Sequence, residues 1–398
     1  SLDGKVNPIK GALPFTIKAK EEGFKGIILP AENADEASVV SGIDILPVNH
    51  VGELIAFLKE EQDIKPVESL DFEHLALNSI DEDSDFADVR GQENIKRALE
   101  IAAAGGHNVI LIGAPGAGKT MLAKRLPSIL PPLNLDEALE TTKIHSVAGK
   151  LNKGRGILHC RPFRAPHHTI SDIALVGGGG IPQPGEISLA HNGVLFLDEL
   201  PEFKRTVLEV MRQPLEERKV TISRAKFTVE YPSSFMLIAA MNPCPCGYYN
   251  HPEKDCTCDK KSVNNYMAKV SGPLLDRIDI HIEVTPVNFD ELSNSRKSEP
   301  SKNIRERVLN ARKIQELRFR NKEGIYCNAQ MTNPMVRSLC PINETCKQLL
   351  KNAMEKVGLS ARAYDRILKV SRTIADLENS ENIEAHHLAE AINYRSLD

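Results

Sequence analysis

The chain contains no tryptophan, and aromatic residues make up only 5% of its 398 residues. It also lacks an uncharged apolar stretch long enough to span a membrane, and its first ten residues contain no apolar signal core. These absences argue against membrane and secreted proteins, so the expected location is the cytoplasm, without a membrane partner. A hydrophobic fraction of 41% and a charged fraction of 26% are ordinary for a soluble α/β protein.

The chain has no excess of positive charge. Its formal net charge is -4, so any contact with nucleic acid must come from a local basic patch. The first residue is Ser1 rather than methionine, and the opening segment resembles the middle of a domain. We therefore expect further sequence upstream of this chain.

Changes in residue pattern divide the chain into four parts. Residues 1–66 alternate short apolar runs with helical patterns, which predicts a small α/β unit. Residues 67–85 form an acidic stretch with too few apolar side chains to bury, and we expect a linker. Residues 86–287 contain the apolar runs 109–112, 194–197 and 235–240, typical of a parallel sheet covered on both faces. Residues 288–398 predict a polar connector and a helical lid.

A complete phosphate-binding motif follows the first of these apolar runs. Residues 113–120 match G-x-x-x-x-G-K-[ST], with a strand pattern before them and a helical pattern after them. Backbone N–H groups of such a loop bind phosphates, Lys119 is expected to reach the β and γ phosphates, and Thr120 to bind Mg²⁺. The ATP-binding residues are therefore Gly113, Ala114, Pro115, Gly116, Ala117, Gly118, Lys119 and Thr120.

Two adjacent carboxylates end the second run. Parallel sheets bind ligands at the carboxyl ends of their strands, so Asp198 is expected to hold Mg²⁺ and Glu199 to orient the attacking water. The third run ends at Asn242, whose amide is the candidate sensor of the γ-phosphate. An Asn before Pro is also a common turn, and that alternative stays open.

Several further stretches resemble the ComM/YifB family of magnesium-chelatase-like AAA+ ATPases. They are residues 161–168, 184–191, 242–247, 271–279 and 360–366. The resemblance extends over nearly the whole chain. It implies an AAA+ P-loop core of α/β class with a C-terminal helical lid.

The same resemblance implies a ring, expected to be hexameric, with ATP bound between subunits. Arg277 is then the expected arginine finger and Arg362 the expected second sensor, with Arg366 one helical turn beyond it. An ion pair of Arg277 with Asp276 or Asp279 is the alternative. Arg362 could equally be a solvated surface residue.

The family is linked to DNA processing in natural transformation, with helicases that drive branch migration. Single-stranded or branched DNA is therefore the expected partner of this chain. Residues 220–229 predict a β-hairpin that presents Arg224 and Lys226 as candidate DNA contacts, although a plain solvated hairpin is the alternative. The basic segment 153–168 is a second candidate, but its Pro and Phe residues could equally pack against the core.

The N-terminal unit resembles the C-terminal half of a Lon-type protease domain. Such a site needs a serine nucleophile and a lysine base, but Leu13, Pro14 and Phe15 stand where the lysine is expected. We predict no peptidase activity.

Four of the eight cysteines lie close together, at Cys244, Cys246, Cys256 and Cys258. They offer four soft ligands for a tetrahedral Zn²⁺, with His251 as a substitute, and four free thiols are the alternative. A metal here would fix the loop that follows Asn242. The other cysteines, Cys160, Cys327, Cys340 and Cys346, are expected to be ordinary thiols.

The sequence thus favours an ATP-hydrolysing DNA motor. Two alternatives remain open: a chelatase-type motor subunit that remodels a partner protein, and a scaffold that binds ATP but hydrolyses little of it.

Overall fold

The structure is a computed structural model. It describes residues 1–68, 85–151, 157–180, 182–223, 228–251, 253–286, 298–322, 324–358 and 360–395. Among these residues, no helix is both long and apolar enough to cross a membrane.

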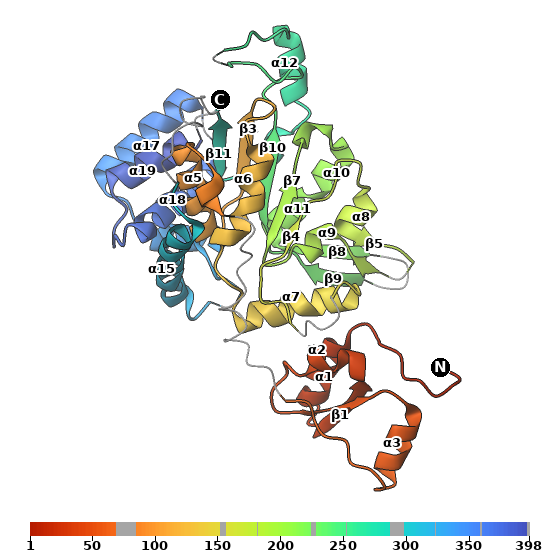
Figure 1. Cartoon of the computed structure of the whole chain (residues 1–398). Helices are drawn as coiled ribbons and strands as arrows, with labels where there is room; N and C mark the ends of the chain where they lie inside the picture. The colour runs from red at the N-terminus through yellow and green to blue at the C-terminus, as the bar shows by residue number, and fades with distance from the viewer. Residues whose placement is uncertain are drawn as a thin grey trace.

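The N-terminal unit is built on two parallel strands (Figure 1). Its elements are α1 (Ala12–Glu21), β1 (Gly26–Pro30), η1 (Ala31–Asn33), α2 (Ala34–Ala37), β2 (Asp44–Val48) and α3 (Val51–Leu58). The unit packs against α7 (Leu135–Val147), whose Leu139 contacts the apolar core of the unit. The Ser146 hydroxyl of α7 donates to the buried carboxylate of Glu36, which also accepts the Leu13 amide at 3.0 Å.

The central element is a five-stranded parallel sheet with the order β11-β3-β10-β7-β4. The strands are β3 (Val109–Gly113), β4 (Phe163–Arg164), β7 (Val194–Leu197), β10 (Met236–Met241) and β11 (Ile280–Val284). The expected apolar strands at 109–112, 194–197 and 235–240 are confirmed. β10 lies between β3 and β7, so the tip of β10 is next to both the phosphate-binding loop and the two carboxylates.

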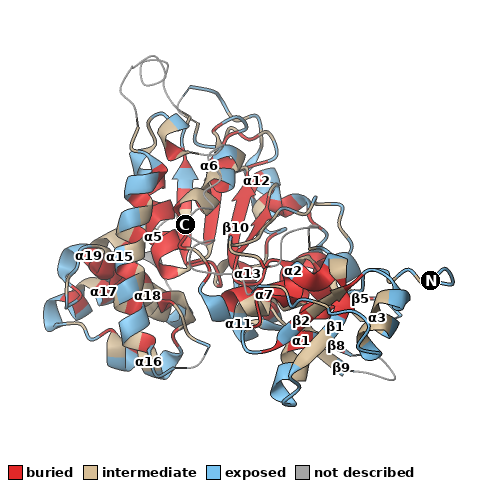
Figure 2. Ribbon diagram, turned by 60° about the horizontal axis from the view of Figure 1, so that its bottom comes forward, coloured by how far each residue is buried: buried red, intermediate tan, exposed pale blue. Residues whose placement is uncertain are grey.

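Both faces of this sheet are covered, because alternate residues of each strand enter two different apolar cores. Val109 and Leu111 of β3 pack with α5 (Glu93–Gly105) and the C-terminal helices, whereas Ile110 between them packs with the segments that follow β4 and β7. Figure 2 shows the strands buried between helices whose outer surfaces are exposed. Burial on both faces explains why the strands are continuous apolar runs.

The C-terminal helices share the first of these cores with the sheet. They are α15 (Ser301–Phe319), η5 (Asn328–Gln330), α16 (Asn333–Leu339), α17 (Glu344–Val357), α18 (Ala361–Leu377) and α19 (Ala385–Asn393). α15 and α18 pack against α5 (Glu93–Gly105). The AAA+ type of α/β fold with a helical C-terminal region is therefore confirmed.

Shorter elements connect these parts. On the N-terminal side of β7 they are η2 (Phe86–Asp88), α6 (Lys119–Arg125), η3 (Leu126–Ile129), α8 (Asp172–Val176), β5 (Gly177–Gly178), β6 (Gln183–Pro184) and α9 (Glu186–Leu189). After β7 they are η4 (Leu200–Glu202), α10 (Arg205–Val210), α11 (Arg212–Glu217), β8 (Lys219–Ser223), β9 (Thr228–Pro232), α12 (Lys260–Met267) and α13 (Gly272–Leu275).

Candidate active site

The phosphate-binding loop connects β3 to α6. Gly116 has φ 79° and Gly118 has φ 87°, a backbone conformation that other residues rarely adopt. Glycine at both positions lets the loop turn tightly enough to present successive backbone N–H groups to a phosphate. The loop therefore has the conformation that the motif predicts.

Lys119 lies over this loop and is almost fully buried. Its Nζ donates to the carbonyl oxygens of Gly113 at 2.6 Å and Ala114 at 2.9 Å, and to Oδ1 of Asn242 at 3.1 Å. Burial lowers the pKa of Lys119, and the nearby carboxylates at the end of β7 oppose that shift. The ammonium group is thus held at the loop by neutral acceptors.

The two groups expected to bind Mg²⁺ are in direct contact. Thr120 Oγ1 donates to Asp198 Oδ2 at 2.6 Å. The other carboxylate oxygen of Asp198 accepts the Glu199 amide at 2.9 Å. Hydroxyl and carboxylate oxygens are the ligands that Mg²⁺ takes in P-loop sites, and both are present here at one point.

The backbone of Glu199 is left-handed, with φ 53° and ψ 48°. This conformation costs about 1–3 kcal/mol for a residue with a side chain. The side chain is 59% exposed, and its Oε2 lies 3.3 Å from Nδ1 of His168. Sequence reasoning missed this partner: it noted His168 only as part of the motif 161–168.

Asn242 occupies the position between these groups. It follows β10, which pairs with β3 on one side and β7 on the other. The contact with Lys119 places its amide beside the phosphate-binding loop. The five groups Lys119, Thr120, Asp198, Glu199 and Asn242 therefore lie together at the carboxyl edge of the sheet.

A cavity of about 480 Å³ opens beside Glu199 and Asn242, and Tyr266 and Lys269 also line it. Burial raises the pKa of Tyr266 to about 12, and the charge of Glu202 adds to the shift. Lys269 Nζ lies 3.3 Å from a carboxylate oxygen of Glu202. No motif pointed to Tyr266 or Lys269, because their position depends on how the loop before α12 folds.

Arg277 and Arg362 lie elsewhere. Arg277 is 4% exposed and its guanidinium lies 2.5 Å from Glu216, not against Asp276 or Asp279 as the alternative expected. Among the described residues, the buried Nε of Arg277 has no hydrogen-bond partner. The main-chain carbonyl of Arg277 accepts from the Asn108 side chain at the start of β3. Arg277 is therefore at the amino edge of the sheet.

Arg362 lines a cavity of about 530 Å³ at this same edge, together with Asn108, Glu216 and Arg366. Arg366 forms an ion pair with Asp279, the residue before β11. Burial alone would raise the pKa of Asp279, but the charge of Arg366 and a hydrogen bond from His107 hold it well below its usual range. β3 has five residues, so the two edges of the sheet are about 17 Å apart. Neither arginine is near the phosphate-binding loop of its own chain.

The described part of the basic segment 153–168, which includes β4, has a structural role. Arg161 makes a bidentate pair with Glu137 at 3.0 and 2.8 Å, and Arg164 makes one with Glu186 at 2.6 and 2.7 Å. Phe163 stacks on Phe196 of β7, with ring centroids 6.0 Å apart. The packing alternative therefore describes this segment better than DNA contact does.

Arg161→Met is expected to lower the free energy of unfolding by about 3–5 kcal/mol, because it leaves the Glu137 carboxylate buried without its partner. The two side chains are only 12% and 6% exposed. Urea denaturation measures the change. The more exposed pair offers a matched control, Arg164→Met, expected to cost about 1 kcal/mol or less. An Arg161→Met protein as stable as the wild type would contradict the structural role.

The expected hairpin is present. β8 and β9 pair antiparallel, with Ser223 opposite Thr228. The candidate DNA contacts Arg224 and Lys226 fall between these residues in the segment 224–227, outside the described residues.

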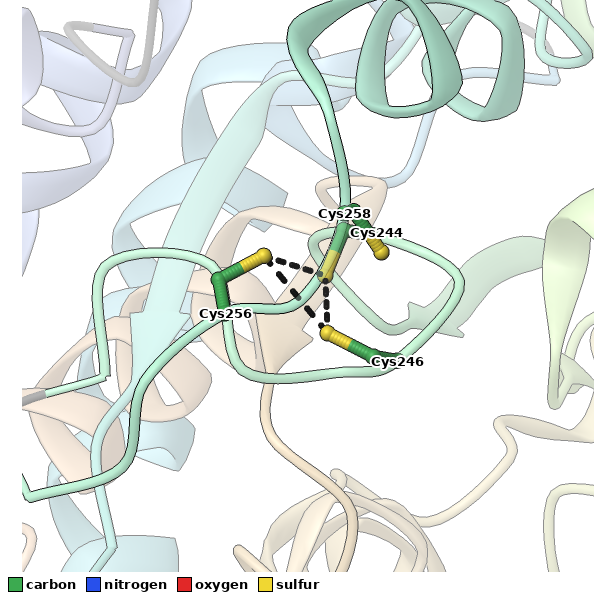
Figure 3. A group of neighbouring side chains, drawn as sticks. All are labelled: Cys244, Cys246, Cys256 and Cys258. Atoms are coloured by element: carbon green, nitrogen blue, oxygen red, sulfur yellow. Dashed lines mark hydrogen bonds between the residues drawn. The ribbon is translucent and has the colours of Figure 1, made fainter.

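The four clustered cysteines meet in space (Figure 3). Cys244 Sγ lies 3.3 Å from Cys246 Sγ and 3.7 Å from Cys256 Sγ, and the last two sulfurs are 3.5 Å apart. All four sulfurs lie within 4.8 Å of one another. His251 is not in this group, since its Nδ1 accepts the backbone amides of residues 253 and 254.

Two family models match the chain. Residues 85–292 match the model described as magnesium chelatase, subunit ChlI, and residues 298–395 match its C-terminal counterpart. Together they cover the sheet and the C-terminal helices.

Curated relatives agree with these matches. The chain is 42% identical over 400 residues to competence protein ComM of Haemophilus influenzae, covering 100% of this chain and 76% of ComM. It is 41% identical over 399 residues to the uncharacterized protein YifB of Escherichia coli, with the same coverage. A third similarity, 34% identity over 159 residues, is to Lon protease 2 of Bacillus subtilis and covers 36% of this chain and 27% of that protein. With its phosphate-binding loop, its paired carboxylates and full-length similarity to ComM and YifB, the chain belongs to the ComM/YifB family of magnesium-chelatase-like AAA+ ATPases.

Proposed function

We propose that this protein hydrolyses ATP at the interfaces of a head-to-tail ring and uses the reaction to move or remodel DNA. One observation carries the hydrolytic part: the expected catalytic groups are divided between opposite edges of the sheet. Lys119, Asp198 and Glu199 are at the carboxyl edge, whereas Arg277 and Arg362 are at the amino edge. A single chain cannot bring these groups together across about 17 Å.

Each group at the carboxyl edge has a distinct role. Lys119 exchanges its two carbonyl acceptors for the β and γ phosphates, and Thr120 and Asp198 provide oxygen ligands for Mg²⁺. Mg²⁺, when bound, neutralises charge that develops on the phosphate oxygens. Glu199 orients and deprotonates the attacking water in the cavity that it lines with Asn242. The four-sulfur group is a separate candidate, for zinc.

The amino edge supplies the rest of the site to a neighbouring subunit. Arg277 and Arg362 act in trans, where a guanidinium offsets the charge of the γ-phosphate in the transition state. When one surface of a subunit binds a different surface of the next copy, repeating this contact produces a ring if the rotations between neighbouring subunits add up to a full turn. We propose six subunits on the strength of the family resemblance.

The DNA part of the proposal depends on the β8–β9 hairpin. Its strands pair as far as Ser223 and Thr228, and Arg224 and Lys226 fall between these two residues in the sequence. Basic side chains in a ring pore contact phosphates without regard to sequence. In the basic segment 153–168, Arg161 and Arg164 are already paired with Glu137 and Glu186 and contribute less. The similarity to a protein named for competence also supports a DNA substrate.

ATP turnover is expected to increase when single-stranded or branched DNA is added. The double variant Arg224→Ala/Lys226→Ala should lose this increase but keep the turnover measured without DNA. When the logarithm of DNA affinity is plotted against the logarithm of salt concentration, the slope for the wild type should be steeper than that for the double variant by about 2. Each phosphate contact that the variant loses accounts for about one unit. A coupled ATPase assay and DNA-binding titrations at several salt concentrations provide the measurements.

Lys219→Ala is the matched control, because Lys219 lies on the same hairpin but pairs with Glu230 at 2.9 Å. Turnover that ignores DNA would contradict the DNA proposal. It would favour the second candidate, a motor that remodels a partner protein, which the chelatase family match supports. Absence of turnover under all conditions would leave only the ATP-binding scaffold.

A further inference from the structure

We propose that Cys244, Cys246, Cys256 and Cys258 bind one Zn²⁺, and that this ion holds the loop 242–259 against the phosphate-binding loop. Nucleotide binding and turnover then depend on zinc as well as on magnesium. The metal site itself stands without any assumption about activity. Its effect on the ATP site rests on the proposed function.

The spacing of the sulfurs fits one shared ion. Zinc bound by four thiolates at about 2.3 Å in a tetrahedron places the sulfurs about 3.8 Å apart. The separations among Cys244, Cys246 and Cys256 are 3.3, 3.5 and 3.7 Å, and all four sulfurs lie within 4.8 Å of one another. Disulfides would instead join the sulfurs in pairs at about 2.05 Å, and three nearly equal separations do not form pairs. A four-sulfur tetrahedral site selects zinc or iron over magnesium and calcium.

The four cysteines each offer one sulfur atom to a common point. Cys244 is fully buried. Four thiolates brought this close repel one another strongly, and a divalent cation at their centre removes much of that repulsion.

The loop connects directly to the active site at both of its ends. Before the first cysteine, Asn242 contacts Lys119 at 3.1 Å. After the last cysteine, Asp259 caps α12, and its side chain accepts the Ser262 amide. α12 and the residues just beyond it carry Tyr266 and Lys269 to the catalytic cavity beside Glu199. An ion that joins the two ends of the loop therefore fixes Asn242 before the loop and Tyr266 and Lys269 after it, and all three line that cavity.

The middle of the loop touches the phosphate-binding loop itself. Gly247 has φ 85°, and a Cβ added there would lie 2.4 Å from Cδ of Pro115. Only glycine allows the backbone at residue 247 to lie this close to the ring of Pro115. Removing the metal frees the loop between Cys244 and Cys258, and this contact is then lost.

Metal content tests the site directly. The full chain, purified under reducing conditions, is expected to contain about one zinc per chain by elemental analysis, as structural four-cysteine sites do. Cys256→Ser and Cys258→Ser should each lose most of this zinc. Cys160→Ser, an exposed cysteine outside the cluster, is the matched control and should retain it. Iron in place of zinc, or a chain that neither contains nor takes up zinc, would overturn the proposal.

The coupling to the ATP site needs a second measurement on the wild-type chain. A thiol reagent releases the metal, and binding of a fluorescent ATP analogue is compared before release, after release and after reduction with added zinc. Affinity should fall on release and return with zinc. Turnover should fall up to about 100-fold, the loss that a displacement of about 1 Å causes. Unchanged nucleotide affinity after zinc release would refute the coupling.

Gly247→Ala separates the two parts of the proposal. It leaves all four thiols intact, so zinc content should match the wild type, while nucleotide affinity falls because Pro115 is displaced. If the zinc-loaded wild type did not bind nucleotide, the proposed ATP function would be wrong. The measured zinc content would still test the metal site. Full nucleotide affinity in Gly247→Ala would rule out the contact as the route of coupling.

Discussion

Glu199→Gln is expected to reduce ATP turnover by at least about 100-fold while ATP binding stays close to that of the wild type. The amide retains the size of the carboxylate but cannot accept the proton of the attacking water. The groups proposed to bind the phosphates and Mg²⁺, Lys119 and Thr120, form their hydrogen bonds with partners other than the side chain that changes. Steady-state turnover and binding of a fluorescent ATP analogue measure the two effects separately.

Glu209→Gln provides the control for this variant. Glu209 is a carboxylate of α10 that pairs with Arg212 at the surface, outside the cavity beside Asn242. It should hydrolyse ATP at the wild-type rate. If Glu199→Gln hydrolysed ATP equally well, the water-orienting role would belong to another residue.

Arg277→Ala is expected to lower turnover by about 10³-fold or more, the size of effect that an arginine finger has on phosphoryl transfer. Nucleotide binding by the isolated chain should hardly change, because Arg277 is at the opposite edge of the sheet from Lys119. Glu216→Gln is the control, since it breaks the ion pair of Arg277 and keeps the guanidinium. If loss of the ion pair alone explained the defect, both variants would be equally inactive.

Mixing experiments show whether Arg277 acts in trans. Lys119→Ala and Arg277→Ala are each expected to be inactive, but equal amounts of the two should recover about one quarter of wild-type turnover. In a random head-to-tail ring, that fraction of interfaces combines an intact phosphate-binding loop with an intact arginine. Absence of recovery in rings shown to contain both subunits would contradict the shared site.

Short, contiguous motifs were the part of the site that could be predicted best. The loop 113–120 and the pair Asp198–Glu199 both depend on a strand and the residues that follow it, and both appear where the patterns placed them. Asn242 was predicted for the same reason, since it ends the next apolar run. In a parallel sheet, the carboxyl ends of strands share one edge, so local patterns suffice to bring these groups together.

Pairings between distant segments were predicted poorly. The arginines of the basic segment 153–168 appeared as candidate DNA contacts, but Arg161 and Arg164 pair with glutamates of α7 and α9. The alternative to the arginine-finger role of Arg277 was an ion pair with a sequence neighbour, Asp276 or Asp279, whereas its ion pair is with Glu216 of α11. The sequence shows where a charged side chain is, but not which oppositely charged side chain the fold places beside it.

By itself the sequence determined that this protein has a P-loop sheet, a phosphate-binding loop, a pair of carboxylates beside it and four cysteines in one loop. Each of these depends on residues adjacent in the chain. Only the tertiary structure decided that Arg277 and Arg362 lie at the opposite edge of the sheet from their own phosphate-binding loop. It also decided that Cys244 to Cys258 converge on one point and that their loop rests on Pro115. These arrangements follow from strand order and helix packing, which are set by burial of apolar surface over the whole domain.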